Sequence, residues 1–295
     1  MLLRFFMNKY IIVNYYSDSN FNRKKELIYC VQKNLNLSFI KRVIIFLENQ
    51  SHKEDLKALK NYKKILFINI NKRLDFRTAI NFADKYLKNS IIIILNLDIF
   101  LANSSQWKNI HKFFNTGYKD KAIICTRTSI LINKLHKQII FQEYDSIKKG
   151  DFSDGWVLRT PFNKKFIKSN LSFSVGNSPG CDGLMMGILN KFYHVYNYQD
   201  KYRIYHLDLV KKNKLTNSSE NFLYKTKYSI INSSADLRPL KRADEWCEIP
   251  LDQDWEFLHK HKKKPICNFS FKKNFFSKFR GIYYYLVFFL LKFKR

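Results

Sequence analysis

Short, continuous apolar runs alternate with helix-like segments along the first part of the chain. Apolar strands separated by helices are typical of a parallel sheet that is covered on both faces, so the pattern predicts a Rossmann-like α/β core. The expected strands are Tyr10–Tyr16, Arg42–Leu47, Ile65–Ile70, Ser90–Leu101 and Lys121–Thr126, and the expected helices are Asn22–Leu35, His52–Tyr62, Leu74–Leu87 and Ser104–Phe114.

This alternation weakens after Thr126. The segment Ile139–Lys165 mixes short apolar runs with Gly, Asp and Pro, as expected of an insertion that faces a second substrate. A helix is expected at Cys181–Phe192 and a strand at His194–Tyr198, whereas Lys211–Pro239 is polar and rich in Asn and Ser, which predicts a loop. The chain therefore divides into an α/β domain (8–210), a loop-rich extension (211–258) and a tail (259–295).

The charge of the chain is strongly positive and is concentrated in the tail. Lys and Arg number 53 against 24 Asp and Glu, which gives a formal net charge of +29. The tail holds eleven basic residues and no acidic one, and its apolar stretch Gly281–Leu291 is too short to span a bilayer. An aromatic stretch between basic clusters suits an anionic membrane surface. The alternative is a last amphipathic helix that packs on the protein's own core.

Several classes of protein are disfavoured by missing motifs. The phosphate-binding patterns of P-loop ATPases and dinucleotide-dependent dehydrogenases do not occur. Residues Met1–Val13 contain two basic residues and no small-residue cleavage site follows, which argues against a signal peptide. Five cysteines without a CxxC pair predict reduced thiols in a cytosol. We therefore expect a cytoplasmic protein that is peripheral to the inner face of the cell membrane.

The strongest candidate for chemistry lies at the end of the most apolar strand, where Asn96–Leu97–Asp98 follows a run of isoleucines. Ligands of open α/β sheets bind at the carboxyl ends of strands, and a carboxylate there can hold a divalent cation that bridges a substrate diphosphate. His206 ends a later short strand and could complete such a metal shell. The alternatives are a helix-capping Asp98 and a structural histidine.

Two further carboxylates are candidates. Asp154 stands beside Trp156 in an expected turn, where the pair could form an acceptor-side wall; the alternative is an Asp-Gly turn with a core tryptophan. Asp182 lies in the first turn of the Cys181–Phe192 helix, where the helix dipole favours a carboxylate. Its alternative role is a helix cap.

The order of these short motifs resembles bacterial glycosyltransferases of GT-A fold, of a family 2-like type linked with surface polysaccharide or lipopolysaccharide assembly. The resemblance covers about Tyr10 to Asp208. It implies a GT-A Rossmann-like mixed sheet flanked by helices, followed here by the basic, aromatic C-terminal extension. The motifs that carry it are Asn96–Ile99, Thr126–Arg127, Asp154–Trp156, Pro179–Asp182 and Tyr205–His206.

The resemblance also implies roles for individual residues. Asp98 and His206 would hold Mn²⁺ or Mg²⁺, with Asn96 in place of the first acid of an Asp-x-Asp site. Asp182 would act as the catalytic base, with Asp154 as the second choice, and Trp156 would lie on the acceptor side. The remaining donor-site candidates are Tyr15, Tyr16 and Ser17 at the nucleoside and Arg77 and Arg127 near the phosphates.

The function expected from these residues is transfer of a sugar from a nucleotide-diphosphate donor to a polysaccharide or lipid-linked acceptor. Two other classes remain open. A basic protein could bind nucleic acid, although the chain has no helix-turn-helix, zinc-finger or RNP-type motif. The second open class is a non-catalytic relative that only binds sugar nucleotides, which is suggested by Asn96 in place of an acid.

Overall fold

The computed structural model describes residues 7–118, 120–133, 138–143, 153–176, 181–198, 201–207 and 244–247. Eleven strands of these ranges form one sheet, whose main path runs in the order β11-β7-β6-β8-β4-β1-β2-β3. The predicted membrane-associating tail (259–295) lies outside the described residues, as does the extension 211–258 apart from one short strand. None of the described helices is long and apolar enough to cross a membrane.

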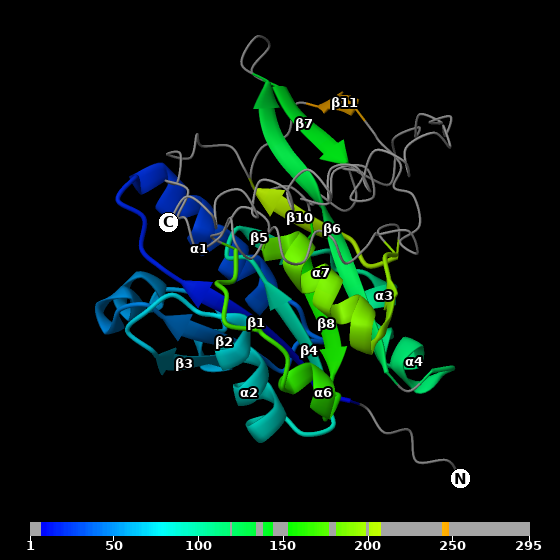
Figure 1. The fold of residues 1–295 in the computed structure, drawn as a ribbon. Coiled ribbons are helices and arrows are strands. Elements are labelled where there is room, and N and C mark those ends of the chain that lie inside the picture. The colour runs from blue at the N-terminus through cyan, green and yellow to red at the C-terminus, as the bar shows by residue number, and fades with distance from the viewer. Residues whose placement is uncertain are drawn as a thin grey trace, which may run out of the picture.

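The first half of the sheet is parallel, as the apolar pattern predicts. Its strands are β1 (Lys9–Tyr15), β2 (Arg42–Leu47), β3 (Ile65–Asn69) and β4 (Ile91–Leu95). The chain moves outward from β1 to β2 and β3, and then crosses back to place β4 on the other side of β1 (Figure 1). The strand order therefore reverses between β1 and β4.

The second half of the sheet is antiparallel, which the apolar pattern alone does not predict. Strand β8 (Ser153–Arg159) lies between β4 and β6 (Lys121–Asn133) and runs antiparallel to both. The expected turn at Ser153–Trp156 is therefore wrong: these residues begin β8. Strand β7 (Gln138–Glu143) extends β6 into a ribbon that rises above the rest of the fold in Figure 1, with β11 (Asp244–Cys247) at its edge. The sheet is mixed, in agreement with the GT-A resemblance.

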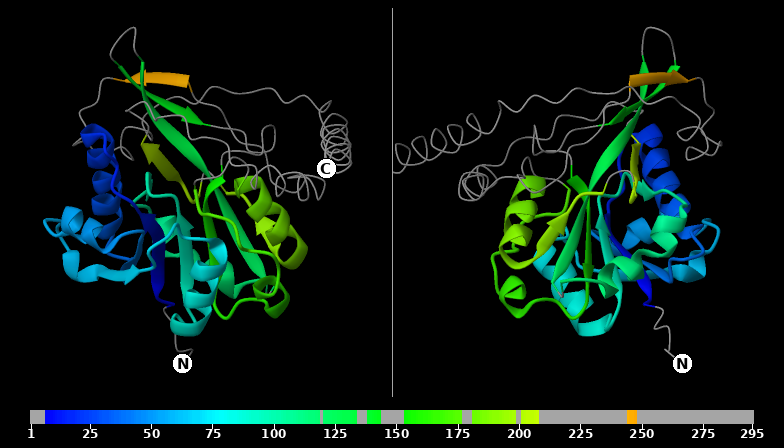
Figure 2. Two further views of the ribbon diagram at one scale, coloured as in Figure 1. Left: turned by 60° about the vertical axis from the view of Figure 1, so that its left-hand side comes forward. Right: turned by 90° about the vertical axis from the view of Figure 1, so that its right-hand side faces the viewer.

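Helices cover both faces of the sheet (Figure 2). Alternate strand residues point to opposite faces, so Ile11 and Val13 pack in one apolar cluster and Tyr10 and Ile12 in the other. The first cluster is covered by α1 (Phe21–Leu35), η1 (Gln50–Leu56), η2 (Tyr62–Lys64), α3 (Ser105–Lys108) and α4 (Ile110–Asn115). The second is covered by α2 (Phe76–Tyr86), α6 (Lys164–Ile167) and α7 (Cys181–Phe192).

Three predicted elements are divided in the structure. The expected helix His52–Tyr62 is replaced by the two 3-10 helices η1 and η2, and Asn61 between them has a left-handed φ of 61°, which an α-helix cannot include. The expected helix Ser104–Phe114 is split into α3 and α4. The apolar run 90–101 is divided into β4 and β5 (Ile99–Leu101), because the chain turns at 96–98. This last break creates the candidate site.

Candidate active site

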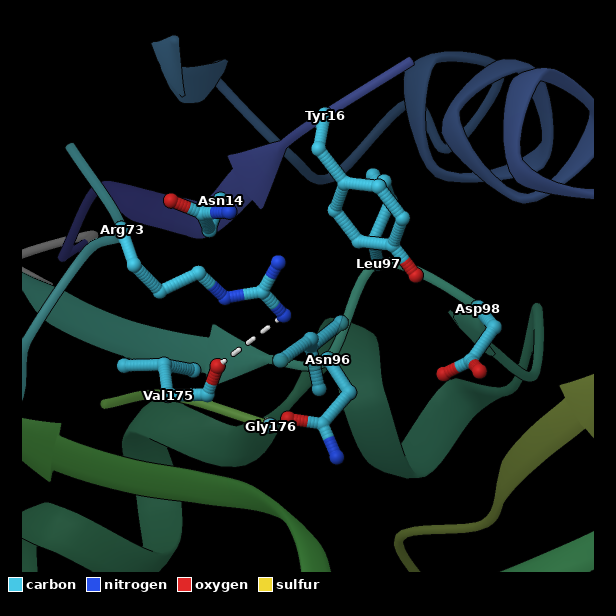
Figure 3. Close-up of a pocket in the computed structure, with 9 residues that line it drawn as sticks. Asn14, Tyr16, Arg73, Asn96, Leu97, Asp98, Val175 and Gly176 are labelled. Atoms are coloured by element: carbon cyan, nitrogen blue, oxygen red, sulfur yellow. Dashed lines mark hydrogen bonds between the residues drawn. The ribbon is translucent and has the colours of Figure 1, made fainter. Parts of the chain in front are cut away.

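A small pocket opens at the carboxyl ends of β1 and β4, where the strand order reverses. Open α/β sheets bind their ligands at this kind of switch point. Tyr16 follows β1, Asn96 and Asp98 follow β4, Arg73 comes from the loop before α2, and Gly176 closes the floor (Figure 3). The enclosed space measures about 20 Å³, enough for an ion or a water molecule. A nucleotide would therefore have to lie over its open side.

The sheet register brings the two predicted metal ligands together. Strand β10 (Ile204–Leu207) pairs with β5 and with β6, which sets His206 opposite Ile99 and next to Asp98. The distance from His206 Nε2 to Asp98 Oδ2 is 3.2 Å. On its other side the imidazole is held by Ser129, whose Oγ lies 3.3 Å from Nδ1. Asp98 and His206 are thus neighbours although 108 residues separate them.

Asp98 also has a cationic partner that the sequence did not suggest. Arg23, in the first turn of α1, donates from Nη2 to Asp98 Oδ2 and from Nη1 to Glu26 Oε2. Its exposed fraction is 3%. Burial alone would lower the pKa of Arg23, but the charges of Asp98 and Glu26 more than offset this and raise it, so the guanidinium stays charged.

The side-chain amide of Asn96 is bonded to Asp154. It donates from Nδ2 to Asp154 Oδ1 at 2.5 Å, while Asp154 Oδ2 accepts from Arg127 Nη1 at 2.8 Å. Burial would lower the pKa of Arg127, but the charges of Asp154, Asp98 and Asp182 together raise it. Arg127 therefore lies within electrostatic reach of all three candidate carboxylates.

Asp182 lies in the first turn of α7, as expected. It is 9% exposed, and its Oδ1 accepts a hydrogen bond from Cys181 Sγ at 3.1 Å. Both oxygens of Asp154 are engaged by Asn96 and Arg127, and the thiol on Asp182 is a weak donor.

The end of the pocket beside Tyr16 contains residues that the sequence analysis missed. The guanidinium of Arg73 stacks 4.6 Å from the ring centroid of Tyr16 and donates to Glu48 Oε1 at 2.8 Å. Glu48 also accepts from Asn14 Nδ2 at 2.6 Å. The available signals were a polar Asn14 inside an apolar strand and Glu48 directly after the next strand, both at the carboxyl edge of the sheet.

Two of the residues predicted to bind the donor, Tyr15 and Ser17, do not line the pocket but contact a residue behind it. Tyr15 is fully buried and donates from its hydroxyl to Asp55 Oδ2 at 3.2 Å. Burial would raise the pKa of Asp55, but hydrogen bonds from Lys24, Ser17 and Tyr15 hold it below its usual value. Tyr15 and Ser17 thus tie the start of the pocket to η1, whereas Tyr16 lines the pocket itself.

Two other predicted residues are placed away from the pocket. Arg77 donates from Nε to Ser172 Oγ at 3.0 Å and from Nη2 to the Ser169 carbonyl at 2.8 Å. Arg73, four residues earlier in the loop before α2, lines the pocket instead. Trp156 has no exposed surface and packs edge-on against Phe76 at 4.9 Å, so its expected contact with an acceptor is wrong.

Position 176, at the floor of the pocket, has room for a glycine only. Its φ is +71°, and a Cβ there would lie 2.4 Å from Asn96 Oδ1. Gly117 has a similar φ of +68° with nothing within 4 Å, which makes it a matched control. We expect Gly117→Ala to lower the free energy of unfolding by about 1–2 kcal/mol, because alanine is strained in the left-handed conformation. Gly176→Ala should lower it further and should also weaken the binding of a donor in the pocket.

Thermal unfolding and donor titration of both variants would check this expectation. Equal stability losses in the two variants, with unchanged donor affinity, would show that the close approach of Gly176 to Asn96 is unimportant.

Within the described residues, no group of three or more His, Cys, Asp or Glu side chains is placed to share a metal ion. The pair Asp98 and His206 nevertheless fits a divalent cation. Two adjacent ligands of an octahedral ion, each about 2.1 Å from it, lie about 3 Å apart, close to the 3.2 Å observed between Oδ2 and Nε2. The contact between Ser129 Oγ and Nδ1 orients the imidazole, as a hydrogen-bonding partner of a metal-binding histidine commonly does.

No protein-family model and no curated protein matches the sequence. Solved structures with partial similarity include several glycosyltransferases, each at low sequence identity and with a TM-score below 0.5. The mannosyltransferase PcManGT from Pyrobaculum calidifontis, in complex with GDP-Man and Mn²⁺, is 9% identical with a TM-score of 0.47, over 76% of this chain and 62% of that one. TarS residues 1–349 from S. aureus, with UDP-GlcNAc, is 13% identical with a TM-score of 0.49, over 77% and 68%.

GalNAc-T7 with UDP, GalNAc and Mn²⁺ is 9% identical with a TM-score of 0.48, over 75% of this chain and 47% of that one. The chain thus spans less than two thirds of the mannosyltransferase and of GalNAc-T7. At these identities and TM-scores the likeness supports no conclusion about the function of this chain. The assignment of function has to rest on the side chains of the pocket.

Proposed function

We propose that the chain is a glycosyltransferase that moves a sugar from a nucleotide-diphosphate donor to a hydroxyl of a saccharide or lipid-linked acceptor. The observation that carries this proposal is the meeting of Asp98 and His206 with Arg73 and Tyr16 around one pocket or directly beside it. This pocket opens at the switch point of the sheet, where α/β folds bind nucleotides. Such a donor needs a surface for its base, a positive group for its phosphates and ligands for a metal ion. The aromatic ring, the guanidinium and the carboxylate–imidazole pair match these needs in that order.

Asp98 and His206 are the residues that would hold the cation, and the diphosphate and water would fill its remaining ligand positions. A bound Mn²⁺ or Mg²⁺ would supply charge compensation for the departing diphosphate. The chain itself contributes orientation. Ser129 fixes the imidazole of His206 so that Nε2 faces Asp98, and Asn96 links the end of β4 to Asp154.

The remaining polar groups are assigned either to the sugar donor or to the sugar acceptor. Arg73, which stacks on Tyr16, is positioned to meet the nucleoside or its phosphates. Asp182 is proposed to accept the proton of the acceptor hydroxyl as the new glycosidic bond forms. Asp154, bonded to Asn96 and Arg127, is proposed to position these groups, with the base role as its alternative.

Localisation at a membrane stays a prediction of the sequence alone. The basic, aromatic tail 259–295 is expected to hold the enzyme at an anionic membrane surface, close to a lipid-linked acceptor. Deleting Phe271–Arg295 should release the protein from anionic liposomes without lowering its melting temperature. Co-sedimentation and melting curves of both forms test this, and a large loss of stability would favour a core helix instead.

A thermal-shift screen tests the proposed function. Sugar nucleotides with different bases should be compared with and without Mn²⁺, because a ligand stabilises only the form that binds it. We expect one donor at about 100 times its Kd to raise the free energy of unfolding by about 2.7 kcal/mol. This increase should be smaller when Mn²⁺ is left out. Stabilisation by duplex DNA and by no sugar nucleotide would instead favour the nucleic-acid-binding class.

A further inference from the structure

Arg23 is a buried cation that the proposed catalytic steps do not use. It lies in the first turn of α1 with 3% of its surface exposed. Its Nη1 donates to Glu26 Oε2 at 2.7 Å and to the Leu207 carbonyl at 3.1 Å, while its Nη2 donates to Asp98 Oδ2. These bonds hold the guanidinium against the carboxylate that is proposed to bind the cation.

The same oxygen of Asp98 serves two partners. Oδ2 accepts from Arg23 and lies 3.2 Å from His206 Nε2, so the atom nearest to the proposed second ligand is already bonded to a positive group. A divalent cation on this oxygen would lie next to the guanidinium charge. Like charges this close repel each other, and more strongly beside a mostly buried side chain than in open water.

A buried carboxylate needs a partner when no cation is bound. The side chain of Asp98 is 12% exposed, and an uncompensated charge there would be costly. Glu26, 6% exposed, gives Arg23 a second anionic partner. Arg23 can therefore loosen its bond to Asp98 without becoming an unpaired buried charge.

We propose that Arg23 is a built-in counter-ion that competes with the divalent cation for Asp98 and thereby keeps metal affinity low until a diphosphate binds. This inference rests on the proposed function, in which Asp98 and His206 hold the cation. The negative charge of the diphosphate offsets the repulsion between the cation and Arg23. Metal and donor are then bound together, and Arg23 acts as a positioning residue through Asp98.

The opposite possibility is that Arg23 supports the metal site by fixing Asp98, as hydrogen-bonded neighbours of ligands often do. The two roles predict changes of opposite sign. Loss of a supporting residue weakens metal binding, whereas loss of a competitor tightens it. General damage to the fold could only weaken binding.

Titration of the full-length protein with Mn²⁺ alone, followed by the electron paramagnetic resonance signal of free Mn²⁺, tests the proposal. Arg23→Gln keeps a hydrogen-bond donor beside Asp98 but removes the charge, and it should bind Mn²⁺ about 10-fold to 100-fold more tightly, the range over which groups bonded to a ligand change metal affinity. Arg23→Lys keeps the charge and should stay near the wild-type affinity.

Two further variants keep the test decisive. Arg23→Gln with Glu26→Gln removes the guanidinium together with one of its two carboxylate partners, so the net charge of the protein is unchanged. This variant covers the case in which the single variant does not fold, and it should also bind Mn²⁺ more tightly. Asp98→Asn should weaken binding in every background. UDP or GDP should raise the Mn²⁺ affinity of the wild type more than that of Arg23→Gln.

Failure of this inference can be told apart from failure of the proposed function. If Asp98→Asn weakens Mn²⁺ binding but the Arg23→Gln variants bind equally or less tightly than the wild type, competition by Arg23 is wrong and the metal site stands. If Asp98→Asn binds Mn²⁺ as well as the wild type, the metal site itself is wrong and the inference falls with it.

Discussion

Replacing Asp98 by Asn should lower sugar transfer by about 10²–10³-fold, the loss seen when one group that stabilises developing charge is removed. Asn keeps the size of the side chain and an oxygen that accepts from Arg23. Alanine is the poorer choice, because it would leave the buried guanidinium without this partner. The variant should also lose the part of donor binding that depends on metal, since it removes the anionic ligand of the cation.

The measurement is release of nucleoside diphosphate, with and without Mn²⁺. Asp84→Asn is the matched control: this half-buried carboxylate only accepts a backbone hydrogen bond, from the Phe162 amide at 3.0 Å. It should report the cost of losing a structural carboxylate without touching the pocket. Full activity of Asp98→Asn that still requires metal would refute the assignment.

Replacing Asp182 by Asn should lower turnover by about 10²–10⁴-fold while leaving donor affinity almost unchanged. The amide keeps the shape of the carboxylate at the start of α7 but cannot accept the proton of an acceptor hydroxyl. The rate and the donor KM should therefore respond differently, with the loss in kcat.

Asp154→Asn is the informative comparison for this prediction. Asp154 is bonded to Asn96 and Arg127, so its replacement should disturb the pocket and raise the donor KM. If Asp182→Asn is nearly silent and Asp154→Asn lowers kcat, the two roles must be exchanged. If both variants turn over normally, a mechanism with either carboxylate as base is wrong.

Local sequence signals were sufficient for the parallel half of the fold. Strands β1 to β4 are continuous apolar runs, and α1 and α2 show apolar positions at helical spacing, so period and composition agreed with the tertiary structure. The antiparallel insertion of β8 between β4 and β6 depends on pairing between segments about 60 and 30 residues apart. Such pairing leaves no local signal, and the Asp154–Gly155 pair inside β8 resembles a turn.

The candidate site was predictable where chemistry is tied to a strand end. Asp98 and His206 were proposed because each stands at the end of a short apolar strand in the sequence, and the register of β10 places them side by side. Arg73, which lines the pocket, and Arg23, which is bonded to Asp98, were not among the predicted residues. In the sequence Arg23 is an ordinary residue of a polar helix start, and only the packing of α1 beside β5 buries it against Asp98.

The prediction of Arg77 shows the same limit, because Arg73 was not considered. The two residues are four positions apart in the sequence, and nothing in the local pattern marks Arg73 as the one that lines the pocket. The N-cap of α2 at Asp75 fixes Arg73 in the preceding loop, facing Tyr16, and directs Arg77 to the carbonyl of Ser169 on the outside. Cap geometry therefore decides which arginine lines the pocket.

The central claim is that the pocket at the ends of β1 and β4 binds a nucleotide diphosphate and a divalent cation. Crystals grown with Mn²⁺ and UDP or GDP, measured for anomalous scattering from manganese, test this claim most directly. We predict an anomalous peak bonded by Asp98 and His206, with the nucleotide against Tyr16 and Arg73. A manganese peak away from Asp98, or a nucleotide bound elsewhere on the molecule, would contradict it.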